Sequence, residues 1–149
     1  ILYTLKYKGR YRIGMIMGRY LAQEMIPSGF FDGIDLIIPV PLHPGKQKKR
    51  GYNQSEWIGK GISEITGIPM NLDSVVRIVA NPTQTHKNSV ERWQNVEGIF
   101  ALTSRHILHG KHILLVDDVL TTGATISSCA IAITSVEECR ISVLTLATA

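Results

Sequence analysis

The sequence predicts an α/β fold in which a mainly parallel central sheet carries helices on both faces. Short apolar runs, typical of buried strands, alternate along the chain with stretches whose apolar residues recur every three to four positions, as in amphipathic helices. The run from Ile113 to Val116 shows no polar alternation, as expected of a parallel strand covered on both faces. We therefore expect right-handed crossovers between the strands.

Three helices are expected from the spacing of the apolar residues. The first begins at Tyr11 and is ended by residues 27–29, Pro-Ser-Gly. Its predicted core-facing stripe is Ile13, Ile16, Met17, Tyr20, Leu21 and Met25, and its predicted solvent face is Arg12, Arg19 and Gln23. The second covers about residues 53–65 and turns inward Trp57, Ile58, Ile62 and Ile65. The third covers the apolar-periodic residues 126–133.

Four strands are expected, near residues 34–40, 75–79, 113–117 and 140–147. Pro39 lies inside the first of them and lacks a backbone N–H, so we expect the last residues of that strand to be excluded from central pairing. Residues 1–8 alternate only weakly and predict either a short strand or a helical arm.

Length and composition indicate one globular domain covering residues 1–149. A hydrophobic fraction of 44% argues against disorder, no apolar run is long enough to span a bilayer, and the start lacks the pattern of a signal peptide. These features predict a cytoplasmic protein with no membrane partner. Cys129 and Cys139 lack the spacing of a disulfide framework or a metal site, so we expect free thiols.

Two carboxylates, Asp117 and Asp118, follow the buried run, and a short turn leads from them into a helix. The turn consists of Thr121, Thr122, Gly123, Ala124 and Thr125. Backbone N–H groups and hydroxyls converge there, where the helix dipole favours an anion. The pattern suits a ligand with a phosphate at one end and hydroxyls in the middle, such as a phosphorylated ribose.

Other interpretations of this stretch fit less well. A response-regulator receiver also has a strand ending in two aspartates, but most of that domain follows the pair, whereas only residues 119–149 follow here. A P-loop requires Gly-x4-Gly-Lys-Ser/Thr, which the sequence lacks. An ordinary buried strand with a capped helix remains the alternative without a function.

The stretch from Val116 to Thr125 resembles the phosphoribosyl pyrophosphate loop of type I phosphoribosyltransferases. The resemblance implies that Asp117 and Asp118 act in catalysis, facing the ribose 2′- and 3′-hydroxyls. It also implies that they hold Mg²⁺, directly or indirectly, as the cofactor. The turn from Thr121 to Thr125 would hold the 5′-phosphate.

A second informative stretch runs from Pro39 to Gln54. Three prolines lie at the end of the first strand, and the cations Lys46, Lys48, Lys49 and Arg50 follow, on what we expect to be a loop. Charge runs usually face solvent, but open α/β sheets bind ligands beyond the carboxyl ends of their strands, so the loop and the acidic pair are expected to share a crevice. The net charge of +4 fits an anionic substrate, a nucleic acid, or neither.

This second stretch, Val-Pro-Leu-His-Pro followed by Arg-Gly-Tyr-Asn-Gln, resembles the ComF family of phosphoribosyltransferase-like proteins, which is associated with competence and DNA uptake. The similarity covers nearly the whole chain, including residues 5–9. The strand end of related amidophosphoribosyltransferases implies that Pro41, Leu42 and His43 line a diphosphate site, although His43 may instead be a loop histidine satisfied by its surroundings. ComF proteins commonly carry a zinc ribbon upstream; since this chain does not begin with Met, such a segment is left open.

A long polar connection follows the 75–79 strand, and in the resembled families it belongs to a loop that closes over the substrate. Gln84, Arg92 and Asn95 match the family pattern, and Arg77 matches a basic residue at the pyrophosphate end. The family often has a second basic residue two positions on, where this chain has Val79. That difference implies weaker diphosphate binding.

Three histidines, His106, His109 and His112, lie three positions apart before the 113–117 strand. The segment from His109 to Lys111 has the composition of a turn, and metal ligands need a fixed scaffold, so we expect surface residues and not a metal site.

The resemblance implies either of two functions. One is a Mg²⁺-dependent phosphoribosyltransferase that uses phosphoribosyl pyrophosphate. The other is a non-catalytic module that binds phosphoribosyl pyrophosphate or a nucleotide and serves DNA uptake through competence-machinery proteins. Single-stranded DNA binding through residues 46–50, with Tyr52 and Trp57 as stacking candidates, is a third and less favoured possibility. The acceptor is not evident from any stretch.

Overall fold

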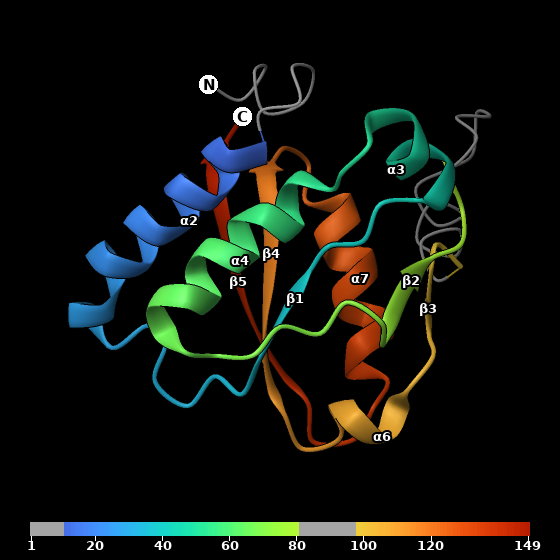
Figure 1. Cartoon of the computed structure of the whole chain (residues 1–149). Coiled ribbons are helices and arrows are strands. Elements are labelled where there is room, and N and C mark those ends of the chain that lie inside the picture. Colours follow the sequence, from blue (N-terminus) through green and yellow to red (C-terminus); the bar gives the residue numbers. More distant parts are fainter. Residues whose placement is uncertain (1–10, 81–97) are drawn as a thin grey trace.

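The structure is a computed structural model that describes residues 11–80 and 98–149. Its centre is a three-stranded parallel sheet in the order β1 (Leu36–Pro39), β4 (His112–Leu120) and β5 (Arg140–Thr148). Figure 1 shows α2 (Tyr11–Met25) and α4 (Gln54–Thr66) on one side of the sheet and α7 (Ala124–Thr134) on the other. The predicted α/β class, with a mainly parallel sheet between helices, is confirmed. Residues 1–8, expected to form either a short strand or a helical arm, lie outside the described residues.

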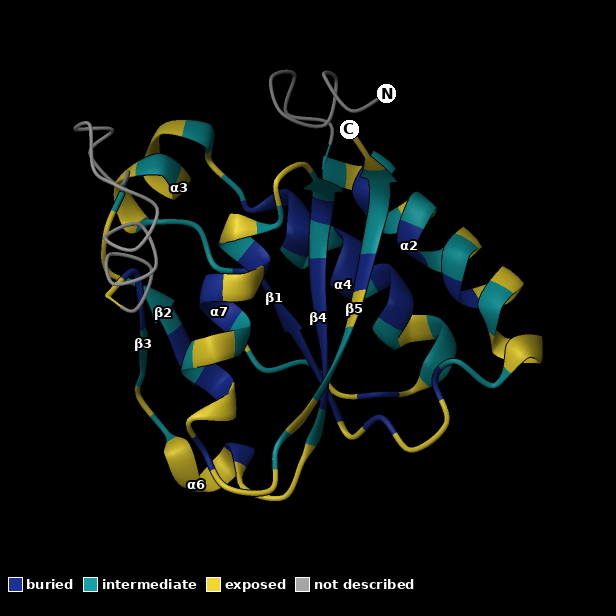
Figure 2. Ribbon diagram, turned by 180° about the vertical axis from the view of Figure 1, so that it is seen from behind, coloured by how far each residue is buried: buried dark blue, intermediate teal, exposed yellow. Residues whose placement is uncertain are grey.

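Alternation along the strands divides the core into two layers. Ile113 and Leu115 belong to the cluster that packs against α7, whereas Leu114 and Val116 belong to the cluster that packs against α4. All four side chains are fully buried, and Figure 2 shows the lower part of β4 as a continuous buried segment. Helices cover both faces of the sheet, so residues 113–116 are all apolar and show no polar alternation.

The central strand extends further than predicted. Asp117 was expected to end it, but β4 continues to Leu120 because β5 is equally long and keeps pairing with it: Val119 lies opposite Ala147 and Leu120 opposite Thr148. The acidic pair therefore lies within a paired strand, close to its carboxyl end.

The strand predicted at residues 75–79 is present at 75–77, but it does not join the parallel sheet, so its predicted place in that sheet was wrong. Residues 75–77 form β2 (Val75–Arg77), which pairs antiparallel with β3 (Phe100–Leu102) in a separate two-stranded sheet. The free edge of β1 is already occupied, because Ile37 N donates to Pro69 O and Asn71 N donates to Ile37 O.

Pro39 does not exclude the end of β1 from pairing, contrary to expectation. It lies in register with Val116, and Val40 N donates to Val116 O over 2.9 Å. Backbone groups of a parallel strand alternate between its two sides, and those of Ile37 face residues 69–71, away from β4. The nitrogen of Pro39 falls on that same side, so its missing N–H costs the sheet no bond.

The buried stripe of α2 was predicted only in part: Leu21 and Met25 pack against the core as expected, but the fully buried positions differ. Its buried residues are Gly14, Gly18 and Ala22, whereas Ile16 and Tyr20 are 57% and 55% exposed. An added Cβ on Gly18 would fall within 3.0 Å of the Ile58 backbone. The two helices thus cross so closely that only small residues fit between them. Apolar periodicity favoured the bulky residues and missed this contact.

Three short elements complete the described chain: η1 (Ile26–Ser28), α3 (Pro44–Arg50) and α6 (Arg105–Leu108). The basic run was expected on a loop but forms α3, because His43 caps the start of this helix and Gly51, at φ 84°, ends it. In the described residues we find no helix with the length and apolar character that crossing a membrane requires.

Candidate functional site

The carboxyl end of β1 leads into α3, and that of β4 leads into α7, so both helices begin at one edge of the sheet (Figure 1). The first turn of α4 meets β4 there. Ser55 Oγ donates to Asp117 Oδ1 over 2.9 Å, and Gln54 Nε2 donates to Asp118 Oδ2 over 3.0 Å. Both carboxylates are therefore oriented by the same helical turn.

That turn is itself fixed to the end of β1. Asn53 caps α4 by accepting from Ser55 N over 3.1 Å, and its Nδ2 donates to Val40 O over 3.1 Å. Asn53 and Ser55 are buried, at 6% and 2% exposure. Because a buried polar group must find partners within the protein, these bonds hold α4 at one position relative to the strands.

The acidic pair has an unusual proton affinity. Burial raises the pKa of Asp117 to about 6, and the negative charge of Asp118 adds to the rise, while hydrogen bonds from Asp118 N and Ser55 oppose it. Carboxylate oxygens are the ligands that Mg²⁺ prefers, and Mg²⁺ is usually held by one or two carboxylates with water and substrate oxygens completing its shell. The donor set of Asp117 and Asp118 fits such an ion.

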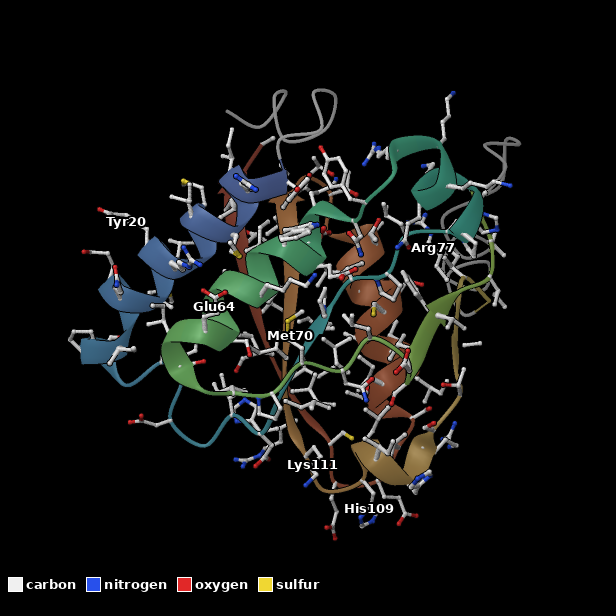
Figure 3. All side chains as sticks on the ribbon, viewed as in Figure 1. Tyr20, Glu64, Met70, Arg77, His109 and Lys111 are labelled. Atoms are coloured by element: carbon white, nitrogen blue, oxygen red, sulfur yellow. The ribbon has the colours of Figure 1, made fainter. Side chains whose placement is uncertain are left out.

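Cations also lie near the acidic pair. Burial lowers the pKa of Arg77, and the charge of Asp117 opposes this, so the two groups are within electrostatic range. Burial also lowers the pKa of Lys46, to which the charges of Arg77 and Arg50 contribute. Figure 3 shows Arg77 beside α3. The structure thus brings together two predicted parts of the site, the basic run and Arg77.

The predicted anion-binding turn, residues 121–125, lies at the start of α7. Gly123 adopts a left-handed backbone, at φ 78°, and Ala124 N donates to Thr122 Oγ1 over 3.3 Å. Thr121 and Thr122 are exposed, whereas Thr125 is half-buried. The exposed Thr121 and Thr122 thus lie beside the N-terminus of α7, a position that favours an anion.

The segment Pro41, Leu42 and His43 is half-buried and connects β1 to α3. Nδ1 of His43 accepts from Gly45 N over 3.1 Å, so this histidine is satisfied locally as a helix cap. The site residues Gln84 and Arg92, like Asn95, lie outside the described residues.

The three histidines do not form one group. His106 and His109 are exposed, as predicted, and Figure 3 shows His109 at the opposite end of the molecule from Arg77. His112 is half-buried, with Nε2 at 2.8 Å from Ser142 Oγ, so it was wrongly predicted as a surface residue. Residues 11–80 and 98–149 contain no cluster of three or more His, Cys, Asp or Glu suited to a metal.

Both cysteines are free, as expected. Cys139 Sγ donates to Leu108 O over 2.8 Å. Burial raises the pKa of Cys129 to about 12, and the charge of Asp117 contributes, which places this thiol near the acidic pair in its unreactive form.

Sequence reasoning missed the roles of Gln54 and Ser55. Gln54 appeared only as the end of the Arg-Gly-Tyr-Asn-Gln motif, and no function was given to Ser55. A usable signal was present: two polar residues open a helix whose other inward residues are apolar or glycine, and buried polar side chains need partners. The identity of those partners required the tertiary structure.

Comparison with known proteins gives a consistent picture. Residues 16–149 match the model of the phosphoribosyl transferase domain. The DNA utilization protein YhgH of Salmonella typhi is 30% identical over 133 residues, which cover 87% of this chain and 58% of that protein. Competence protein F of Haemophilus influenzae is 38% identical over 95 residues, 62% of this chain and 41% of that protein. The chain therefore spans at most about three fifths of the length of these relatives.

Among solved structures, glutamine phosphoribosylpyrophosphate amidotransferase from B. subtilis, complexed with ADP and GMP, aligns with a TM-score of 0.65. The alignment covers 97% of this chain and 30% of that one at 19% identity, so it bears on the fold alone.

Proposed function

The chain belongs to the phosphoribosyl transferase domain family, as a ComF-family, type I phosphoribosyltransferase-like protein, and on this premise we propose that it binds 5-phosphoribosyl 1-pyrophosphate and transfers the phosphoribosyl group. The observation that supports the proposal is the gathering of three kinds of group where the carboxyl ends of β1 and β4 meet. The 121–125 turn starts α7 after β4, the acidic pair lies near the carboxyl end of β4, and the cations Lys46, Arg50 and Arg77 lie close to one another, with Arg77 in electrostatic range of Asp117.

Each part has a chemical role in this proposal. The turn before α7 holds the 5′-phosphate with N–H groups and hydroxyls. Asp117 and Asp118 accept hydrogen bonds from the ribose hydroxyls, and Lys46 and Arg77 neutralise the diphosphate. Bound Mg²⁺ would neutralise diphosphate oxygens beside the carboxylates.

The reaction is a substitution at C1 of the ribose. A nucleophile forms a bond to C1, the bond from C1 to the diphosphate oxygen breaks, and that oxygen keeps the electron pair. Charge develops on the leaving diphosphate, so fixed cations and correct positioning supply most of the catalysis. We leave the acceptor nucleophile open and place the reaction in the cytoplasm.

A second candidate function is a binding module without turnover, which acts in competence or DNA uptake through partner proteins or single-stranded DNA. Val79 favours it, because this position often carries a second basic residue in the family, and here its carbonyl only accepts a 3.1 Å bond from Arg77 Nε. The printed names of the relatives refer to competence and DNA utilization.

Calorimetry with phosphoribosyl pyrophosphate and Mg²⁺ tests the proposal, and phosphorus NMR of the same samples detects released pyrophosphate. We expect saturable binding by the parent and none by the Asp117→Asn/Asp118→Asn double variant with an unchanged circular dichroism spectrum. Binding without pyrophosphate release, with water or with candidate acceptors, would select the binding module. Equal binding by the folded double variant would show that the site is misassigned.

A further inference from the structure

Two hydrogen bonds connect the basic helix α3 to the acidic pair. Arg50, the last residue of α3, donates from Nη1 to Gln54 Oε1 over 3.1 Å. Gln54 donates in turn from Nε2 to Asp118 Oδ2 over 3.0 Å. The two bonds use opposite ends of one side-chain amide. Arg50 and Asp118 together therefore fix the direction in which the Gln54 amide points.

Burial makes this connection stiff. Gln54 is 4% exposed and Asp118 is 7% exposed. If the amide rotated away, a buried donor or acceptor would lose its partner, at a cost of about 1–3 kcal/mol. The backbone is held as well, because Asn53 in the same turn donates to the Val40 carbonyl. A displacement of Arg50 is thus transmitted to Asp118 more readily than it is absorbed by the turn.

We infer that Gln54 is a positioning residue that couples the two halves of the ligand site, so that an anion bound at α3 and a ribose bound at the acidic pair strengthen each other. The inference rests on the proposed function for the identity of the two ligand groups. A guanidinium has five N–H donors, so Arg50 can hold Gln54 and an anion at once. An anion that orders the half-buried Arg50 side chain fixes the outer end of this connection, and the ribose then binds a carboxylate whose orientation is already set.

Direct electrostatic interaction between the two ligands would weaken their binding, whereas the proposed coupling through Gln54 strengthens it. Pyrophosphate and ribose 5-phosphate are both anions, and like charges repel through space. Without a connection through the protein, pyrophosphate would leave the affinity for ribose 5-phosphate unchanged or lower it. A Mg²⁺ ion between the two ligands would also raise the affinity, but that gain would persist in Gln54→Leu. Loss of the gain on substitution of Gln54 therefore identifies a path through the protein.

Calorimetry can measure the coupling. The Kd of ribose 5-phosphate is determined with and without saturating pyrophosphate, at constant free Mg²⁺. We expect pyrophosphate to tighten ribose 5-phosphate binding to the parent about five-fold, within the usual range of coupling between sites. In Gln54→Leu the effect should fall to a factor of one or below. In Arg50→Lys it should shrink, because lysine keeps the charge but lacks the planar fork.

Ser55→Ala is the matched control. It removes a hydrogen bond to the acidic pair from the same turn but leaves the path from Arg50 to Asp118 intact. We expect weaker ribose 5-phosphate binding with the pyrophosphate effect preserved. Loss of the effect in Ser55→Ala as well would overturn the assignment to Gln54.

A second measurement does not depend on the folding of Gln54→Leu. Pyrophosphate alone should shift the NMR resonance of the Gln54 side-chain NH₂ in the parent, and this shift should be smaller in Arg50→Lys. The coupling is refuted if pyrophosphate leaves the Gln54 resonance unshifted or leaves the Kd of ribose 5-phosphate for the parent unchanged. It is also refuted if folded Gln54→Leu keeps the full effect of pyrophosphate on that Kd. Ribose 5-phosphate that binds without coupling refutes this inference alone, whereas a parent that binds neither ligand refutes the proposed function too.

Discussion

Ser55 Oγ donates a 2.9 Å hydrogen bond to Oδ1 of Asp117, which joins the first turn of α4 to the central strand. This bond lowers the pKa of Asp117 against the larger upward effect of burial, and the result is a value of about 6. The carboxylate thus changes charge close to neutral pH, at a position set by a residue 62 positions away in the sequence.

We expect Ser55→Ala to move the pH dependence of ligand binding upward. In the proposed function, ribose hydroxyls and Mg²⁺ bind the ionised carboxylate, so parent affinity should rise as the pH increases through about 6. Loss of a hydrogen bond to the charged form raises its pKa, and the midpoint should therefore move to higher pH in the variant. Calorimetric titration of ribose 5-phosphate with Mg²⁺ across the pH range gives both midpoints. A midpoint that stays in place or falls would contradict the assignment.

Asp117→Asn should stabilise the fold at neutral pH. The folded-state pKa of Asp117 is raised from 3.8 to about 6, so the folded chain binds the proton more tightly than the unfolded one. Its stabilising contribution is full below the unfolded value and is lost as the pH rises through about 6. The variant should gain about 3 kcal/mol over the parent between acidic and neutral pH.

Urea unfolding at acidic and at neutral pH measures the gain in the free energy of unfolding. Asp32→Asn, which changes an exposed carboxylate, is the control. An equal pH dependence for parent and Asp117→Asn would show that this carboxyl is not the titrating group.

Gly61→Ala should destabilise the protein although alanine is the better helix former. A Cβ at Gly61 would approach the Met15 carbonyl and Arg19 N of α2 within 3.0 Å, and backbone atoms cannot yield as a flexible side chain would. We expect a loss of about 1–3 kcal/mol, against a gain of about 1 kcal/mol from helix propensity alone. Chemical denaturation checks the sign, with Gln23→Ala on the exposed side of α2 as the control. A stabilised Gly61→Ala would disprove the close crossing.

Gly123→Val should weaken the binding of phosphorylated ligands more than that of free ribose. The nearest atoms to an added Cβ are Leu120 Cδ1 at 3.6 Å and Ser127 Oγ at 4.0 Å, so the cost is backbone strain at φ 78° and not a clash with the protein. Valine strongly disfavours that conformation, whereas asparagine tolerates it. The affinities of ribose 5-phosphate and of ribose are compared in Gly123→Val and Gly123→Asn. This comparison separates the effect of backbone strain from that of adding a side chain. Equal losses for both ligands would indicate general loss of the turn.

The cations of α3 should differ in their effect on ligand binding according to where they lie. Lys46 is half-buried and close to Arg77, whereas Lys48 and Lys49 are exposed. We expect Lys46→Ala to weaken phosphoribosyl pyrophosphate binding while ribose 5-phosphate is little affected, and Lys48→Ala/Lys49→Ala to change neither by much. Titration of single-stranded DNA at two salt concentrations tests the competing role, since each lost phosphate contact reduces the salt slope by nearly one. Unchanged diphosphate affinity with a flattened DNA slope would favour nucleic acid.

The sequence by itself determined the class of fold and the central part of the site. Ile113 to Val116 predict a strand buried on both faces because local hydrophobic pattern and burial coincide in a covered parallel sheet. The acidic pair, the glycine turn and the start of the following helix are adjacent in the chain, so their order is readable without tertiary contacts.

The tertiary structure decided what depends on partners distant in the sequence. Segment 75–77 forms a strand but does not join the parallel sheet. It pairs with residues 100–102, because residues 69–71 already occupy the edge of β1. The glycines of α2 face inward because another helix approaches them, a contact that hydrophobic periodicity does not encode. Gln54 and Ser55 become part of the site only when α4 is placed against β4, since a hydrogen bond needs both groups within about 3 Å.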